Sequence, residues 1–508
     1  MSPEAPPRAV HVSTNSLARN SLWNLLGQVL PMAAALVCIP PLIRLLGVER
    51  FGLLTLISAV IGYFGLFDLG IGRALTKFVA EREDAGGGEE TARLVWSAMS
   101  LLLLLSLVAG AVVALLAPWL TRTVLSVSPP FQRETVGALR VIALGFPVVF
   151  AGNGLRGVLE AAGRFGLTNL VRAPLGVLTF AGPLLAVQFA NSLVAVTAVL
   201  VAGGAFACAG YLGMGLAVMP ALRRHARIDL PTLWPLVRLG SWMTVSSIVG
   251  PVMVYMDRFV IGAVASMSVV AYYTTPYALV SRLWVLPLSL IGVLFPIFSR
   301  TYAADRQRAC AFLFRGIRYV SLMLFPVVLV IVALAREGLG LWLGPGFAEH
   351  SATVLQWLAA AVFFNSLAQV AFSLVQGAGR ADLTARLHLA ELPVYLAALW
   401  WMIVHYGVIG AAVTWAARMA LDSIVLFAFV WRLLPEGRAH IRRLAVASFG
   451  IAAVFALAAL LPATGTRVAF AVSVVAAFVV FGWRIVLTED ERIRLRHPLA
   501  ALAGWQAQ

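Results

Sequence analysis

The chain has 508 residues, of which 61% are hydrophobic and 12% are charged, and its net charge is +16. A soluble domain carries about 25% charged residues, so this composition excludes a soluble globular fold. Strongly basic chains often bind nucleic acid. Here, however, the arginines lie mainly in short loops between apolar segments, where they set orientation in a membrane. The sequence therefore predicts an all-α integral membrane protein that binds no nucleic acid.

Taken in chain order, about fourteen apolar segments are long enough to cross a bilayer, which needs roughly 20 residues per helix. If the N-terminus is cytoplasmic, the loops assigned to the inside hold most of the arginines and the single lysine, Lys77. This excess of positive charge predicts that both termini are cytoplasmic. The approximate spans are 22–46, 51–76, 94–117, 136–158, 167–189, 193–219, 236–262, 270–297, 312–335, 352–376, 384–405, 409–433, 444–461 and 467–487.

An internal repeat relates the two halves of the chain. Residues 159–168 read LEAAGRFGLT and residues 375–384 read VQGAGRADLT, so both contain A-G-R-x-x-L-T between the fourth and fifth spans of their half. Each half has six spans, an even number, so both halves enter the membrane in the same orientation, as in a parallel repeat. Two such lobes that face each other leave a central cavity, which predicts a transporter.

This division predicts four parts of the chain. Residues 1–20 form a cytoplasmic tail, and residues 21–222 form a first lobe with spans one to six. Residues 223–434 form a second lobe with spans seven to twelve, and residues 435–508 hold two further spans and a cytoplasmic tail.

The chain lacks the motifs of catalysis and of nucleotide hydrolysis. No P-loop precedes Lys77, and D-x-D, H-E-x-x-H and G-x-S-x-G are absent. The three cysteines are far apart, which predicts neither a metal site nor a disulfide. We therefore expect no enzyme, no catalytic residue and no cofactor. Transport would draw on a proton or Na⁺ gradient, on the substrate gradient or on a partner.

Two segments resemble a known family. Residues 45–53 (LLGVERFGL) match an L-G-x-x-x-F-G connection between the first two helices, and residues 67–75 (FDLGIGRAL) match a D-L-G-x-x-x-A pattern near the end of helix two. Both are similar to the polysaccharide biosynthesis branch of the multidrug/oligosaccharidyl-lipid/polysaccharide (MOP) exporter superfamily. This branch contains the Wzx-like O-antigen and exopolysaccharide flippases.

The resemblance implies two six-helix bundles in a V shape, with helices 1, 2, 7 and 8 beside the cavity and two extra C-terminal helices. It implies a secondary-type flippase of the bacterial cytoplasmic membrane. Its substrate would be an undecaprenyl-pyrophosphate-linked oligosaccharide repeat unit for O-antigen, capsule or exopolysaccharide synthesis. The expected partners are this lipid-linked glycan and membrane lipids, with the polysaccharide polymerase and export machinery as further candidates.

Basic residues inside the cavity helices are the candidate substrate-binding groups. A charged side chain in a span costs about 2.5–3.5 kcal/mol, so it normally faces a cavity or a partner. A pyrophosphate needs cations, and arginine offers a fork of donors to phosphate. Arg258 and Arg282 lead because each lies well inside an apolar span. Arg73 and Lys77 share one helical face at the cytoplasmic end of span two, where they could instead set orientation or contact lipid headgroups.

Two carboxylates, Asp68 and Asp257, are the candidates for ion coupling. Each lies in an apolar part of a cavity helix, and coupled transport needs a group that binds and releases a proton or Na⁺. Asp68 could instead fix helix two structurally, and Asp257 could pair with Arg258.

Other charges in the spans have a partner at helical spacing. Arg418 and Asp422 are spaced i, i+4, and His388 and Glu391 are spaced i, i+3. This spacing predicts ion pairs within one helix, without a functional role.

Several other functions stay open at this point. Within transport, the alternatives are a cation-coupled multidrug exporter of the same superfamily and a lipid II flippase. A membrane enzyme acting on lipid-linked sugars is a second class, although its usual acidic motifs are absent. A scaffold for a synthesis complex is a third.

Overall fold

The computed structural model describes residues 14–66, 71–84, 88–225 and 252–486, with a few isolated residues between 227 and 234 and at 489. Within these ranges the chain is helical and forms no strand, as the composition predicts. The chain divides into two compact units, residues 1–271 and 272–508.

Unit 1 begins with a long helix and contains most of the first half of the chain. Its elements are α1 (Thr14–Leu46), α2 (Val48–Leu66), α3 (Ile71–Asp84), α4 (Gly88–Trp119) with a π-helical turn η1 (Leu120–Val124), α5 (Pro129–Ala161), α6 (Phe165–Phe189), α7 (Leu193–Val218), the short α8 (Ala221–Arg224) and a helix over residues 252–264.

Unit 2 begins inside α10 and contains the longest helix. Its elements are α10 (Met267–Val280), which starts in unit 1, the 3₁₀ turn η2 (Ser281–Trp284), α11 (Val285–Ala304), α12 (Arg306–Ala333), α13 (Ala335–Leu343), α14 (Pro345–Gly377), α15 (Ala381–Leu433), the 3₁₀ turn η3 (Pro435–Gly437), α16 (Arg438–Leu460), α17 (Thr464–Phe481) and the π-helical turn η4 (Gly482–Val486).

Eleven segments of the described ranges are long and apolar enough to cross a membrane. One of them, α15, has 53 residues and bends at Gly407, whose φ is 58°, so it contains both of the predicted spans 384–405 and 409–433. The predicted spans 51–76 and 236–262 lie partly outside the described residues. The chain is thus a multi-pass membrane protein, and the total of fourteen spans stays a prediction.

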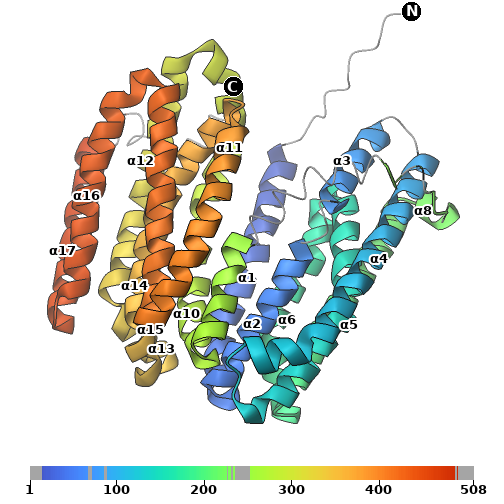
Figure 1. Cartoon of the computed structure of the whole chain (residues 1–508). Helices are drawn as coiled ribbons and strands as arrows, with labels where there is room; N and C mark the ends of the chain where they lie inside the picture. The colour runs from blue at the N-terminus through green and yellow to red at the C-terminus, as the bar shows by residue number, and fades with distance from the viewer. Residues whose placement is uncertain are drawn as a thin grey trace, which may run out of the picture. The chain divides into compact units, whose positions relative to one another are not determined.

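Small residues and aromatic rings pack these helices. In unit 1, a methyl group at Gly110 of α4 would lie 2.6 Å from the Ala143 carbonyl oxygen of α5. Such close backbone approach is how apolar helices associate in lipid, where no hydrophobic force drives them together. In unit 2, rings of α12, α14, α16 and α17 form one cluster, and α16 and α17 lie beside α12 (Figure 1). Its members are Phe325, Phe363, Phe455 and Phe478.

The repeat found in the sequence is a repeated turn in the structure. Gly163, between α5 and α6, and Gly379, between α14 and α15, have φ of 69° and 76°. Each glycine is followed by an arginine whose N–H donates to the carbonyl five residues earlier, at 2.9 Å for Arg164 and 3.1 Å for Arg380. This is the Schellman end of a helix, and its left-handed residue favours glycine. The A-G-R motif therefore turns the chain in the same way in both units.

The division between the units falls later than the boundary predicted between residues 222 and 223. The segment around residue 265 packs in unit 1: Ser126 N–H donates to the Gly262 carbonyl at 2.8 Å, and the Ser126 hydroxyl donates to Ala263 at 3.0 Å. The prediction rested on the sequence repeat, whereas these contacts depend on tertiary packing. The repeat-based lobes 21–222 and 223–434 stay a prediction.

Connections assigned to one side of the membrane meet in unit 1. Arg50, at the start of α2, donates to Glu134 of α5 and to Asn191 before α7, both at 3.1 Å. Glu49 accepts from the Ser128 N–H at 3.1 Å. The L-G-x-x-x-F-G motif thus supplies two charged residues that tie three connections together. Their meeting agrees with the alternation of loops that the arginine distribution predicts.

We expect Arg50→Ala to lower the thermal unfolding midpoint of the detergent-solubilised protein. The change leaves Glu134, whose side chain is 14% exposed, without its cation, and removing one partner of a half-buried pair costs about 1–3 kcal/mol. Arg122→Ala is the control, because Arg122 is exposed. Equal midpoints for the two variants would contradict this assignment.

Candidate functional site

Two predicted site residues, Asp257 and Arg258, lie together on the helix over residues 252–264. Asp257 is fully buried, and its Oδ1 accepts from the Arg258 N–H at 2.8 Å. The Arg258 guanidinium lies 5.1 Å from the centre of the Tyr255 ring. Tyr255 packs against α2, where a methyl group at Gly62 would lie 2.8 Å from the Tyr255 hydroxyl. Arg258 is therefore held by an aromatic ring that is itself fixed by α2.

Arg282 lies where a membrane-spanning segment changes its helical geometry. The segment 267–304 is α-helical on both sides of η2, and Arg282 belongs to this 3₁₀ turn with its side chain exposed. Pro287 follows five residues later and has no N–H for the Leu283 carbonyl, which is a physical reason for the local change. A charged residue at an interruption inside a span fits a binding role better than a role as an interfacial anchor.

The other predicted residues are less informative. Lys77 is exposed on α3 and pairs with Glu81 one turn later at 3.8 Å, which is the ordinary pairing of an amphipathic surface. Arg73 lies on α3, and its side chain lies outside the described part of the structure, as does the whole of Asp68. The structure thus brings together Asp257 and Arg258, which lie in unit 1, whereas Arg282 lies in unit 2.

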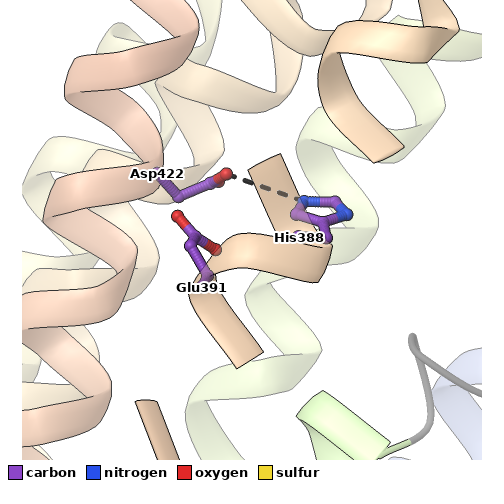
Figure 2. Close-up of side chains that lie close together, drawn as sticks. All are labelled: His388, Glu391 and Asp422. Carbon is purple, nitrogen blue, oxygen red and sulfur yellow. Dashed lines mark ion pairs between the residues drawn. The ribbon is translucent and has the colours of Figure 1, made fainter. Parts of the chain in front are cut away.

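A second group of charges, which we call the hairpin cluster, lies inside unit 2. It consists of His388 and Glu391 on the first arm of α15 and Arg418 and Asp422 on the second arm. Arg418 Nε lies 3.7 Å from Glu391 Oε2, and His388 Nε2 lies 3.7 Å from Asp422 Oδ1. Figure 2 shows Asp422 reaching from one helical arm toward His388 and Glu391 on the other.

The bend in α15 produces this cluster. Glu391 lies 16 residues before Gly407 and Asp422 lies 15 residues after it, so the two residues are level when the arms fold back on each other. Tyr395 and Arg418 are level in the same way, and the Arg418 guanidinium lies 5.2 Å from the centre of the Tyr395 ring. Glu391 is ten residues, or about 15 Å of helix, from the start of α15. The cluster is therefore well inside the span.

The ion pairs run between the arms, so the prediction of pairs within one helix missed the main arrangement. Helical spacing reports only neighbours on one helix, whereas the bend brings residues about 30 positions apart into contact. The signal that could have found the cluster is the equal distance of Glu391 and Asp422 from the turn at Gly407.

The hairpin cluster is buried and incompletely hydrogen-bonded. The Glu391 side chain is 4% exposed, and neither of its oxygens accepts a hydrogen bond from a described residue. Asp422 Oδ2 accepts from Asn365 Nδ2 of α14 at 3.5 Å, while its Oδ1 has the ion pair with His388 alone among the described groups. Buried carboxylates with so few donors are costly and usually mark a functional site in a membrane protein.

Comparison with known sequences places the chain among polysaccharide proteins. Residues 17–302, more than half of the chain, match the family described as "Polysaccharide biosynthesis protein". A protein of Shigella flexneri named "Putative O-antigen transporter" is 28% identical over 416 residues, which cover 81% of this chain and 97% of that protein.

Comparison with solved structures gives the fold. The chain is similar to the lipid II flippase MurJ in an inward closed conformation, with a TM-score of 0.69 and 12% identity over 93% of this chain and 100% of that one. It is also similar to an inward-facing multidrug resistance transporter of the MATE family, with a TM-score of 0.64 and 15% identity over 86% and 97% of the two chains. Both are transporter folds, and the second is described as a member of the MOP superfamily. With this fold and the match over residues 17–302, the chain belongs to the polysaccharide biosynthesis protein family.

Proposed function

We propose that this chain is a secondary-type flippase that moves an undecaprenyl-pyrophosphate-linked oligosaccharide repeat unit across the bacterial cytoplasmic membrane. The observation that carries the proposal is the match to the Shigella flexneri relative, which extends over 97% of that protein. The likeness to MurJ supports a fold able to pass a large lipid-linked sugar. The product would enter cell-surface polysaccharide synthesis as O-antigen, capsule or exopolysaccharide.

The pyrophosphate of such a substrate explains arginines inside the spans. Moving this doubly charged group through a low-dielectric region needs cations with directed donors, which guanidinium groups supply. Arg258 and Arg282 are the proposed main contacts. Arg73 and Lys77 would receive the headgroup nearer the cytoplasm. Asp257 and Asp68 remain candidates for ion coupling by their positions in the sequence.

A transporter of this kind needs no catalytic residue. The proposed energy source is an ion gradient or the substrate gradient, since the sequence lacks a P-loop. Both termini would be cytoplasmic, in line with the positive-inside excess. Membrane lipids are the immediate surroundings, and the polysaccharide polymerase and export machinery are the proposed partners.

Deletion of the gene in its host tests the function. We expect lipid-linked repeat units to accumulate at the cytoplasmic face and surface polysaccharide to fall, and the wild-type chain to restore both. Arg258→Ala and Arg282→Ala should each lower the rate of restoration at least about tenfold, because one charged hydrogen bond contributes about 1.5–3 kcal/mol. Arg258→Lys should fall between, since lysine lacks the fork of donors.

Arg122→Ala, on an exposed position of η1, is the matched control and should restore the wild-type rate. Full activity of both arginine variants would keep the function and remove the site assignment. Unchanged surface polysaccharide after deletion, with sensitivity to toxic organic cations instead, would favour the multidrug exporter. Arrested peptidoglycan synthesis would favour the lipid II flippase.

A further inference from the structure

The hairpin cluster carries an unbalanced charge inside the membrane. Arg418 contributes one positive charge, Glu391 and Asp422 contribute two negative charges, and a neutral His388 contributes none. The net charge is therefore −1 in a region where both carboxylates are buried. A buried net charge in a low-dielectric medium costs several kcal/mol. One added positive charge would make the cluster neutral.

The groups that face Glu391 come from both arms of α15 and from the helix packed against them. The charges acting on Glu391 are those of Asp422, Arg418 and His388. Helix α14 packs along α15 and contributes the amides Asn365 and Gln369, which are 3.4 Å apart, and the Phe372 ring, which stacks on His388 at 6.1 Å.

One more packed element brings a titratable group. The turn η2 contacts the second arm of α15 through Trp284, whose ring lies 6.2 Å from that of Trp415. This turn also carries Arg282, whose side chain is exposed. On the arms themselves, Tyr395 lies beneath the guanidinium of Arg418.

The chemistry of these groups favours a proton over a metal ion. One ligating atom of each of His388, Glu391 and Asp422 lies within 4.8 Å of the others, which is close enough for an ion. However, the Arg418 guanidinium is 3.7 Å from Glu391 and would repel a cation held there. Na⁺ also prefers oxygen ligands, as hard cations do, and the set offers an imidazole nitrogen. A proton needs only a lone pair, and the unbonded oxygens of Glu391 and Asp422 supply it.

We propose that the hairpin cluster binds and releases one proton during each transport cycle. A proton from water bonds to a carboxylate oxygen shared between Glu391 and Asp422, or to the ring nitrogen of His388, and the net charge of the cluster changes from −1 to zero. On release the proton returns to water and the charge of −1 is restored. His388 is the most exposed member, with 32% of its side chain accessible, and is the entry point for the proton. The coupling of this proton to substrate rests on the flippase function proposed above.

Protonation also changes what holds the arms of α15 together. With both carboxylates charged, Arg418 and a charged Glu391 attract across the hairpin. A neutral Glu391 weakens that attraction and allows the arms to separate or slide about the bend at Gly407. A ligand shifts a conformational equilibrium only through different affinities for the two states. The proton satisfies this condition, because the cluster binds it more tightly when the arms are apart from Arg418.

Infrared difference spectroscopy of the purified protein tests proton binding without any substrate. Between about pH 8 and pH 5, we expect the wild type to gain the carbonyl band of a protonated carboxyl group. Glu391→Gln and Asp422→Asn should each lose or shift that band. Asp382→Asn, an exposed acid at the start of α15, should keep it. The same band in Glu391→Gln and Asp422→Asn as in wild type, or its loss in Asp257→Asn instead, would overturn the assignment.

Calorimetry and proteoliposomes complete the test. We expect no heat from NaCl or ZnCl₂ that depends on Glu391, and stoichiometric binding of either ion that Glu391→Gln abolishes would overturn the choice of a proton. In proteoliposomes, flipping by wild type and by Asp382→Asn should respond to an imposed pH gradient, and flipping by Glu391→Gln should lose that response. A Glu391→Gln variant that responds normally would refute coupling through this site. Failure of the wild type to flip the substrate would instead count against the flippase function, while the infrared result stands by itself.

Discussion

Gly52→Ala is expected to abolish recovery of folded protein from the membrane. A methyl group on Gly52 of α2 would overlap the carbonyl group of Met267, at the start of α10. Both atoms belong to backbone, so no side chain can turn away, and the helices themselves would have to separate. Overpacking usually costs about 1–3 kcal/mol, and an overlap with backbone should reach or exceed the upper end of that range. Gly52 belongs to the motif that resembles the flippase family, and this contact gives the motif its physical reason.

The measurement is the yield and unfolding midpoint of the monodisperse protein in detergent. Gly213→Ala is the matched control, because Gly213 lies on α7, another helix of the same unit, with open space around it. Alanine there should leave the midpoint unchanged or raise it slightly, since alanine favours a helix. A Gly52→Ala protein as stable as Gly213→Ala would show that α2 and α10 do not pack in this way.

Arg418→Met should destabilise unit 2 more than the loss of any surface charge. It removes the cation from the hairpin cluster and leaves Glu391 and Asp422 buried with a net charge of −2. Breaking a buried ion pair by removing one partner costs about 3–5 kcal/mol, because the remaining charge is uncompensated. The defect should shrink as the pH falls, since protonating either carboxylate relieves their repulsion.

A second substitution separates this cause from lost packing. Arg418→Met combined with Glu391→Gln restores the charge balance and should recover much of the unfolding midpoint. Arg380→Met, which breaks an exposed pair with Asp382 on the same helix, is the control and should change the midpoint little. If the double variant is no more stable than Arg418→Met, the contribution of Arg418 is its contact with the Tyr395 ring rather than its charge.

The class of protein and its repeated turn follow from local features of the sequence. Apolar segments of span length predict membrane helices, and A-G-R predicts the same turn twice because glycine is favoured where φ is positive. The arginine distribution predicts which connections share a side, and the contacts of Arg50 with Glu134 and Asn191 agree with it.

The hairpin cluster could not be predicted from the same rules. Glu391 and Arg418 are 27 residues apart, and each has a closer partner at helical spacing on its own arm. Only the bend at Gly407 decides that the arms face each other, and helix periodicity carries no information about it. Asp257 and Arg258 were found because charges in an apolar helix stand out one at a time. The repeat likewise could not reveal that residues up to 271 pack with the first unit.

The most direct test of the account uses purified protein in liposomes that contain a fluorescent undecaprenyl-pyrophosphate oligosaccharide. The accessibility of the sugar to an external quencher is followed with and without a proton gradient, for wild type, Arg258→Ala and Arg282→Ala. We expect the wild type to make the sugar exchange between leaflets and both variants to slow that exchange at least about tenfold. No exchange by the wild type above protein-free liposomes, with the substrate intact, would contradict the account.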